Sequence, residues 1–131
     1  MAKIIRPANP DLRYEPPLSI GWGIDSSTVE RPRLTMSRTV IPPGGRNQRH
    51  YHVKCDAGMH ILRGSLRYFF GPSHEQIEAI AEAGDFIFIP QGEIHGLMNV
   101  SDTEPAEIVT CYGGAGSKDE AQTVFVEPPW D

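Results

Sequence analysis

Two histidines separated by a single residue, His50-Tyr51-His52, are the first part of this sequence whose spacing suggests chemistry. In an extended strand, side chains two positions apart point to the same face, so both imidazoles project together. A neutral imidazole is a common metal ligand, and the pair therefore predicts a chelating edge for a divalent cation. Two surface or interface histidines are the alternative interpretation when this pair is taken alone.

The residues around the pair extend the pattern. Gly44 precedes His50 and Gly64 follows His52 at the spacing of G-x5-H-x-H-x3,4-E-x6-G, which the sequence matches at both glycines and both histidines. A second arrangement, G-x5-P-x-G-x2-H-x3-N, follows further along the chain. Its fixed positions are Gly84, Pro90, Gly92, His95 and Asn99.

Two such patterns in this order are far more specific than either alone, and through them the chain resembles the cupin superfamily over roughly residues 33 to 112. The resemblance implies an all-β fold, the double-stranded β-helix or jelly-roll barrel. It also implies one divalent metal near the barrel mouth, held by two histidines and a glutamate of the first motif and one histidine of the second. Carried onto this sequence, the three histidines are His50, His52 and His95.

The sequence departs from the first motif at the glutamate. The position seven residues before Gly64 is Ala57, and the nearest carboxylate, Asp56, stands one residue earlier. We expect Asp56 to be the fourth ligand if a β-bulge between it and Gly64 re-aims its side chain. Otherwise three imidazoles and water complete the shell, and some cupins that resemble this chain in lacking the glutamate are three-histidine oxygenases.

Such a donor set suits Fe(II), Mn(II), Co(II), Ni(II) or Zn(II), and affinity order does not choose among them. A site of this kind keeps open positions, where a substrate can be polarised by a Lewis acid or share Fe(II) with dioxygen. The sequence therefore predicts a small-molecule enzyme with dioxygenase-like or isomerase or lyase chemistry. The alternative is a non-catalytic module that binds a small ligand or a metal.

Other residues near the motifs have less specific interpretations. Gln48, Tyr68 and Asn99 are candidate hydrogen-bonding partners of a substrate, on the assumption that they face the barrel interior with the histidines. Cys55 is interpreted as a small buried hydrophobe and His60 as structural or interfacial, because alternation places His60 opposite its neighbours in the strand. Alternation places Leu66 and Tyr68 on an inward face with Met59 and Ile61, and Leu66 is expected in the core. Arg38 is ambiguous between a core position and a ligand contact, and His74 is expected to be solvated.

These side chains need a scaffold, and Pro- and Gly-rich turns divide the chain into short segments of strand length. The predicted strands are 33–41, 59–62, 65–70, 86–89, 95–100 and 106–112. Segment 74–82 contains good helix formers, yet it also alternates and stands between two strands, so we predict a strand there. We expect residues 33–112 to form the barrel core, 1–32 an N-terminal arm, and 113–131 a tail that packs on the barrel.

Composition excludes several other functions. The net charge is −5 and the basic residues are dispersed, so we expect no nucleic-acid partner. No segment has the length and hydropathy of a membrane span or of a secretory signal, and the two cysteines form no C-x-x-C pair; we expect a cytoplasmic protein with reduced thiols. Open sheet edges favour a homodimer, in which residues 1–32 or the tail near Val124 to Val126 complete a neighbour's sheet.

Overall fold

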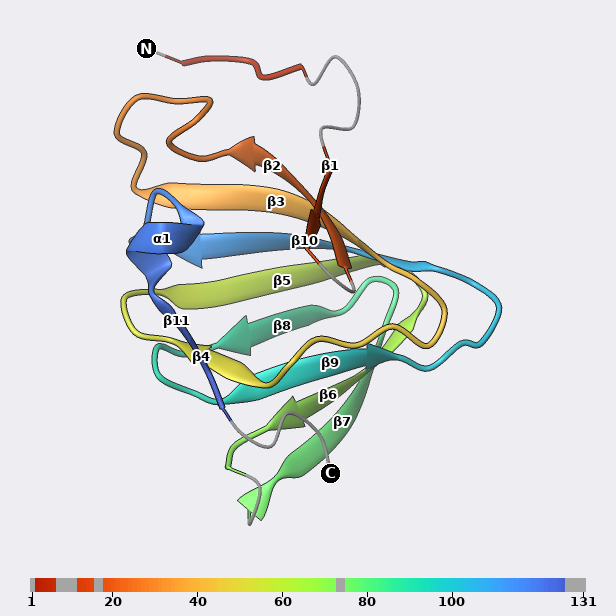
Figure 1. The fold of residues 1–131 in the computed structure, drawn as a ribbon. Helices are drawn as coiled ribbons and strands as arrows, with labels where there is room; N and C mark the ends of the chain where they lie inside the picture. Colours follow the sequence, from red (N-terminus) through yellow and green to blue (C-terminus); the bar gives the residue numbers. More distant parts are fainter. Residues whose placement is uncertain (1, 7–11, 16–17, 73–74, 127–131) are drawn as a thin grey trace.

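The computed structural model describes residues 2–6, 12–15, 18–72 and 75–126. Its strands form two antiparallel sheets, drawn one above the other in Figure 1. The six-stranded sheet has the order β1 (Leu12–Glu15), β2 (Leu18–Ile24), β3 (Leu34–Ile41), β10 (Ala106–Gly113), β5 (Asp56–Arg63), β8 (Phe86–Ile89). The five-stranded sheet has the order β11 (Thr123–Phe125), β4 (His50–His52), β9 (His95–Asn99), β6 (Ser65–Phe70), β7 (Ile77–Glu82). This architecture confirms the predicted double-stranded β-helix.

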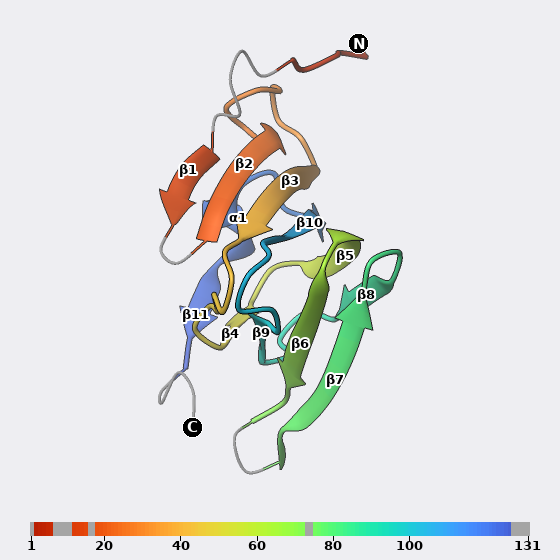
Figure 2. The same cartoon turned by 90° about the vertical axis from the view of Figure 1, so that its right-hand side faces the viewer.

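The core lies between the sheets and follows the period-two alternation of the strands. On β5 and β6 the inward residues Met59, Ile61, Leu66 and Tyr68 are buried and belong to one apolar cluster. Met59 and Ile61 point inward from one sheet, and Leu66 and Tyr68 point inward from the other, as the alternation predicted, because side chains two apart in a strand point the same way. Seen from the side in Figure 2, β1 to β3 lie at one end of the molecule and β6 and β7 at the other.

The segment with competing helix and strand patterns is a strand. β7 pairs with β6 over its whole length, from Ile77 opposite Phe70 to Glu82 opposite Ser65. It is the edge strand of its sheet, and Ala81 is its one buried residue, which explains why its apolar pattern was weak. His74, which we expected to be solvated, lies outside the described residues.

The N-terminal region contains sheet strands where the sequence analysis expected an arm. β2 pairs with β3, from Ser19 opposite Val40 onward, and β1 pairs with β2, so the sheet begins at residue 12 rather than 33. The sequence does carry a signal for β2, because Leu18, Ile20 and Trp22 alternate with the small residues between them. This period of two is typical of a half-buried strand.

The C-terminal segment also pairs within its own chain. β11 runs antiparallel to β4, and the short helix α1 (Lys118–Ala121) precedes it. β11 is the edge strand of its sheet, so the expectation that the tail near Val124 to Val126 completes a neighbour's sheet stays a prediction. The described residues include no helix that is long and apolar enough to cross a bilayer.

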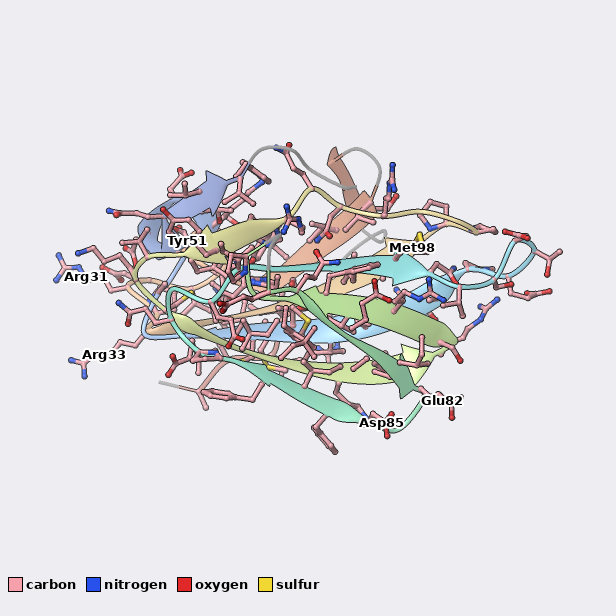
Figure 3. All side chains as sticks on the ribbon, turned by 90° about the horizontal axis from the view of Figure 1, so that it is seen from below. Arg31, Arg33, Tyr51, Glu82, Asp85 and Met98 are labelled. Atoms are coloured by element: carbon pink, nitrogen blue, oxygen red, sulfur yellow. The ribbon has the colours of Figure 1, made fainter. Side chains whose placement is uncertain are left out.

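Tight turns hold the strands in register. Gly64, between β5 and β6, has a φ of +87°, and a Cβ there would lie 2.8 Å from the Cβ of Ala106. Both facts explain why the first motif ends in glycine. In the turn between β7 and β8, the Asp85 carboxylate accepts a hydrogen bond from the Glu82 amide at 2.8 Å; both residues are labelled in Figure 3.

Candidate metal centre

Two strands bring the three motif histidines together. His50 and His52 leave β4 on its buried face, and the pairing of β4 with β9 sets His50 directly opposite His95. The ring centroids of His50 and His95 are 4.3 Å apart, those of His50 and His52 are 5.0 Å apart, and those of His52 and His95 are 5.2 Å apart. One nitrogen from each ring lies within 4.8 Å of the others, so the three histidines could hold one metal ion.

Hydrogen bonds orient each of the three rings through Nδ1. The Nδ1 of His50 is 2.8 Å from the carbonyl oxygen of Gln48, and that of His95 is 2.9 Å from the carbonyl oxygen of Glu93. A carbonyl only accepts, so each Nδ1 carries the proton and donates it, which leaves the lone pair on Nε2. The Nδ1 of His52 is 3.0 Å from the hydroxyl oxygen of Thr123.

The opposite nitrogens of two rings have no partner within the protein. His52 Nε2 and His95 Nε2 are buried, and no hydrogen bond satisfies either atom in the described part of the chain. A buried polar atom without a partner costs roughly 1–3 kcal/mol, so its presence calls for an explanation. A metal ion that accepts both lone pairs supplies one, and the donor set of three imidazoles therefore fits a divalent transition metal.

Burial keeps these rings neutral, which is the form that binds a metal. Loss of hydration, with a smaller repulsion from the charge of His50, lowers the pKa of His95 to about 3 and that of His52 to about 4. The pKa of His50 is also lowered, chiefly by burial. Its hydrogen bond to the Gln48 carbonyl opposes this shift, and the charge of Lys118 adds to it.

Asp56 does not join the three histidines, and its expected role as a ligand is corrected. Its side chain is exposed, and one carboxylate oxygen accepts a hydrogen bond from the Gln91 amide at 2.8 Å. β5 does have a register shift between Asp56 and Gly64, because Glu107 and Ile108 of β10 pair with Arg63 and Ile61 and leave Leu62 unpaired. This shift does not re-aim Asp56, since β5 pairs with β8 in unbroken register from Ala57 to His60. Ala57 takes the inward position instead and is buried in the apolar cluster.

Two of the three candidate substrate contacts are structural. The Tyr68 hydroxyl is buried in the core, where it donates to the sulfur of Met59 at 3.1 Å. Asn99 is also buried, and its side-chain amide donates to carbonyl oxygens of the two loops beside it, including that of Glu104 at 2.8 Å. Neither residue lines the cavity beside the histidines. The second-motif asparagine therefore holds loops together.

Gln48 is the candidate contact that the structure does place at the cavity. This cavity has a volume of about 460 Å³, and His50 and His52 form part of its wall. The Gln48 side-chain nitrogen donates to the carbonyl oxygen of Val126 at 3.2 Å, so the amide helps to attach the C-terminal segment to the barrel.

Much of the cavity wall comes from residues that the sequence patterns did not indicate. β2 contributes Leu18, Ile20 and Trp22, β10 contributes Tyr112, and the C-terminal segment contributes Lys118, Thr123 and Phe125. The ring of Tyr112 packs between Trp22 and His52, with centroids 5.8 and 4.7 Å away. Alternation could have identified the residues of β2. No local pattern predicts that β11 pairs with β4.

The remaining candidates lie away from the cavity. His60 stacks on Phe86 at a centroid distance of 4.2 Å, on the face opposite Met59 and Ile61, as alternation predicted. Cys55 is buried in a small apolar cluster, and burial raises the pKa of its thiol to about 11, which supports a packing role. Arg38 forms an ion pair with Glu107 at the surface.

The fold and the site together define a double-stranded β-helix protein with a three-histidine centre compatible with metal binding. The sequence profile of the family described as "Cupin domain" matches residues 37–112 of the 131. The chain belongs to the cupin family.

Its relatives among curated proteins are germin-like proteins of plants. The chain is 29% identical to Germin-like protein 5-1 of Oryza sativa subsp. japonica over 99 residues, which are 73% of this chain and 44% of that protein. It is also 29% identical to Germin-like protein subfamily 3 member 2 of Arabidopsis thaliana over 86 residues, 65% of this chain and 36% of that protein. The chain thus spans less than half the length of these two relatives.

Solved structures share the fold at lower identity. An oxalate oxidase in complex with the substrate analogue glycolate has a TM-score of 0.72 at 21% identity, covering 92% of this chain and 60% of that chain. The formate complex of Lactobacillus farciminis oxalate decarboxylase has a TM-score of 0.73 at 20% identity, and the match covers 88% of this chain and 34% of that chain. A protein with a double-stranded β-helix domain from Klebsiella pneumoniae subsp. pneumoniae has a TM-score of 0.65 at 22% identity, and the match covers 94% of this chain and 90% of that chain.

Proposed function

We propose that this cupin is a metal-dependent enzyme that acts on a small organic acid in its barrel cavity, with dioxygenase-like chemistry as the first candidate. The observation that carries the proposal is the convergence of three imidazoles whose Nδ1 atoms are already engaged: the Nε2 atoms of His52 and His95 are buried without a partner, and His50 and His52 line a cavity. In metal sites, a ligating histidine commonly donates a hydrogen bond from the ring nitrogen that does not bind the metal, and this bond orients the ring.

Three neutral nitrogens would bind Fe(II), Mn(II), Co(II), Ni(II) or Zn(II) and leave several coordination positions open. A metal bound there supplies Lewis-acid polarisation of a ligand oxygen or, as Fe(II), a shared site for the ligand and dioxygen. The protein contributes the orientation of the rings and a largely apolar wall, which includes Ile20 and Leu97 and limits the access of water to the centre.

The charges at the cavity favour an anionic ligand. Among the described residues that line it, Lys118 is the one Lys or Arg, and there is no Asp or Glu. The three histidines bring no negative charge, so a metal ion and Lys118 together leave the cavity positive. The similar structures with bound glycolate and formate support a small carboxylate as the ligand class.

The missing carboxylate also favours a second candidate, a module that binds a small anion without converting it. Isomerases and lyases move protons by general acid–base groups placed within hydrogen-bond reach of the substrate, often carboxylates or histidines. Here the histidines are the proposed metal ligands, which leaves Lys118 and Tyr112 as the titratable groups of the described wall. Such a wall is adequate for binding and for oxygen chemistry at a metal, and less suited to proton transfer.

Elemental analysis of freshly purified protein, followed by anaerobic reconstitution with each of the five metals, tests the proposal. We expect oxygen uptake with Fe(II) and at least one member of a panel of small carboxylic acids, and none with the corresponding amides. Turnover with Zn(II) or Ni(II) that needs no oxygen would replace oxygenase by isomerase or lyase chemistry. Tight binding of acids that remain unchanged with every metal would establish the binding module instead.

The role of Lys118 is tested by charge removal with a matched control. Lys118→Gln should weaken the binding of a small carboxylate to the metal-loaded protein. It should not weaken metal binding itself, because the charge of Lys118 opposes a positive charge at His50. Lys54→Gln removes the same charge from an exposed residue outside the cavity and should bind the carboxylate as the unchanged protein does. Equal effects of the two substitutions would show that Lys118 acts only through net charge.

A further inference from the structure

The three histidines differ in how their Nδ1 atoms are held. His50 and His95 each use the backbone carbonyl of the residue two positions earlier, Gln48 and Glu93. These contacts are local and come with the strand itself. His52 instead uses the side-chain hydroxyl of Thr123, which is 71 residues away in the chain. Its orientation therefore depends on a strand that is distant in sequence.

That strand, β11, is short and lies at the edge of its sheet. It has three residues, and its register sets Thr123 opposite His52 and Phe125 opposite His50. The Phe125 ring also contacts the ring of His50, with centroids 5.7 Å apart, although 53% of its surface remains exposed. Short edge strands with exposed side chains belong to the less stable parts of a fold and can open locally.

Backbone hydrogen bonds continue the attachment on both sides of the strand. The amide of Val53 donates to the Gln122 carbonyl at 3.0 Å, and the amide of Val126 donates to the Arg49 carbonyl at 3.0 Å. The segment 122–126 is therefore joined to both ends of β4, the strand that carries His50 and His52. Any opening of β11 would remove the hydrogen-bond partner of one histidine and a ring contact of another.

We propose that Thr123 is a positioning residue for His52, and that docking of β11 onto β4 is thermodynamically coupled to metal binding. When the hydroxyl accepts from Nδ1, the His52 lone pair is on Nε2, the nitrogen that joins His50 and His95 at the site. When β11 opens, His52 loses this constraint and the ligand set is incomplete. Because linkage is reciprocal, a metal held by the three rings must also stabilise the docked strand.

The inference rests on the proposed metal site, so its test begins with the Zn(II) affinity of the unchanged protein, measured by calorimetry. Thr123→Val keeps the shape of the side chain and removes the hydroxyl; we expect it to weaken Zn(II) binding about 10- to 100-fold, as loss of such a partner does elsewhere. Thr123→Ser should restore the affinity to within a few-fold. Val124→Ala is the matched control, because it alters the same strand at a residue facing Tyr51, and it should leave the affinity unchanged.

Two NMR measurements distinguish positioning from a general loss of structure. In the metal-free, unchanged protein, the chemical shifts of the His52 ring nitrogens should report the Nδ1–H tautomer. In metal-free Thr123→Val they should report a mixture of the two tautomers. Hydrogen exchange at the amides of Val53 and Val126 should slow when Zn(II) is added to the unchanged protein and slow less in Thr123→Val. Thr123→Ser preserves these tests should the valine variant fail to fold.

The outcomes separate the coupling from the metal site itself. If the unchanged protein binds none of the five metals, the proposed function fails, and the coupling fails with it. If it binds Zn(II) but Thr123→Val binds equally well with an unchanged His52 tautomer, the positioning role is overturned and the metal site stands. If Zn(II) leaves the exchange of Val53 and Val126 unaltered, the coupling to β11 is overturned.

Discussion

Mild acid should destabilise the metal-free protein through the buried histidines. His52 and His95 are held neutral by burial, with pKa values of about 4 and about 3 in the folded chain against 6.5 for an exposed imidazole. A group whose pKa is lowered by folding takes up protons preferentially when the chain unfolds. The contribution of such a group to folding stability is complete above a pH of about 6.5 and is lost progressively as the pH falls toward its pKa in the folded chain.

The size of the effect follows from these values. At a pH of about 5, an unfolded histidine is almost fully protonated and a buried one is not, which favours unfolding by about 2 kcal/mol for each ring. For His52 and His95 together the loss is about 4 kcal/mol, and the lowered pKa of His50 acts in the same direction. This loss is a large fraction of the roughly 5–15 kcal/mol that stabilises an ordinary domain.

Urea unfolding with a metal chelator, at several values between about pH 7.5 and pH 5, measures this loss directly. Most exposed carboxylates titrate below this window, so the histidines dominate the change. His95→Asn should remove roughly half of the pH dependence that His52 and His95 produce together. His60→Asn changes a histidine on β5, away from the three histidines, and should keep all of the pH dependence that His52 and His95 produce. Equal unfolding free energies at both ends of the window would refute the reasoning.

Three further predictions concern the metal, the core and the surface. Because protons compete with metal for imidazole, and burial lowers the pKa values of His52 and His95 to about 4 and about 3, bound metal should be retained at about pH 6 and lost as the pH falls toward about 4, measured by dialysis and elemental analysis; complete loss already at about pH 6 would contradict it. Asn99→Ala should lower the free energy of unfolding by about 2–3 kcal/mol without changing metal affinity, because it leaves buried carbonyls unpaired; unfolding and Zn(II) titrations check both parts. The homodimer expected from the sequence uses open sheet edges; we propose instead that a homodimer forms through the outer face of β5 and β8, where Phe86 and Phe88 are 80% and 67% exposed. Phe88→Ser should then give a monomer mass by light scattering, whereas a monomer before substitution, or an unaltered dimer after it, would overturn this assignment.

The sequence predicted the parts of the fold that depend on local periodicity. His50 and His52 could be paired because one strand sets both rings on one face, and Met59 and Leu66 could be placed in the core for the same reason. The strand at Ile77–Glu82 was found against a helical pattern because its neighbours on both sides were strands. Joining His95 to the pair needed the motif, because no periodicity connects β4 and β9.

The errors at the site have a common physical origin. Asp56 was expected to turn inward, but unbroken pairing of β5 with β8 keeps the strict alternation, so Ala57 faces the interior and Asp56 faces solvent. Tyr68 and Asn99 were correctly expected to point inward, yet an inward residue can meet the core or a loop rather than the cavity. Thr123 was missed because its contact depends on long-range pairing. Local patterns predict which face of a strand a side chain lies on, but not which residue it contacts there.

The alanine at the position of the usual glutamate has a consequence for the proposed chemistry. A carboxylate ligand would reduce the charge of a divalent metal and occupy one of its positions, and Ala57 does neither. Three imidazoles leave the full charge of the metal in a largely apolar cavity, where an uncompensated charge is costly. Compensation must then come from an anion that enters the cavity, and Lys118 in its wall favours the same sign of ligand. Metal and anionic ligand should therefore bind cooperatively, each tightening the other, and a metal affinity that is the same with and without a small carboxylate would contradict this argument.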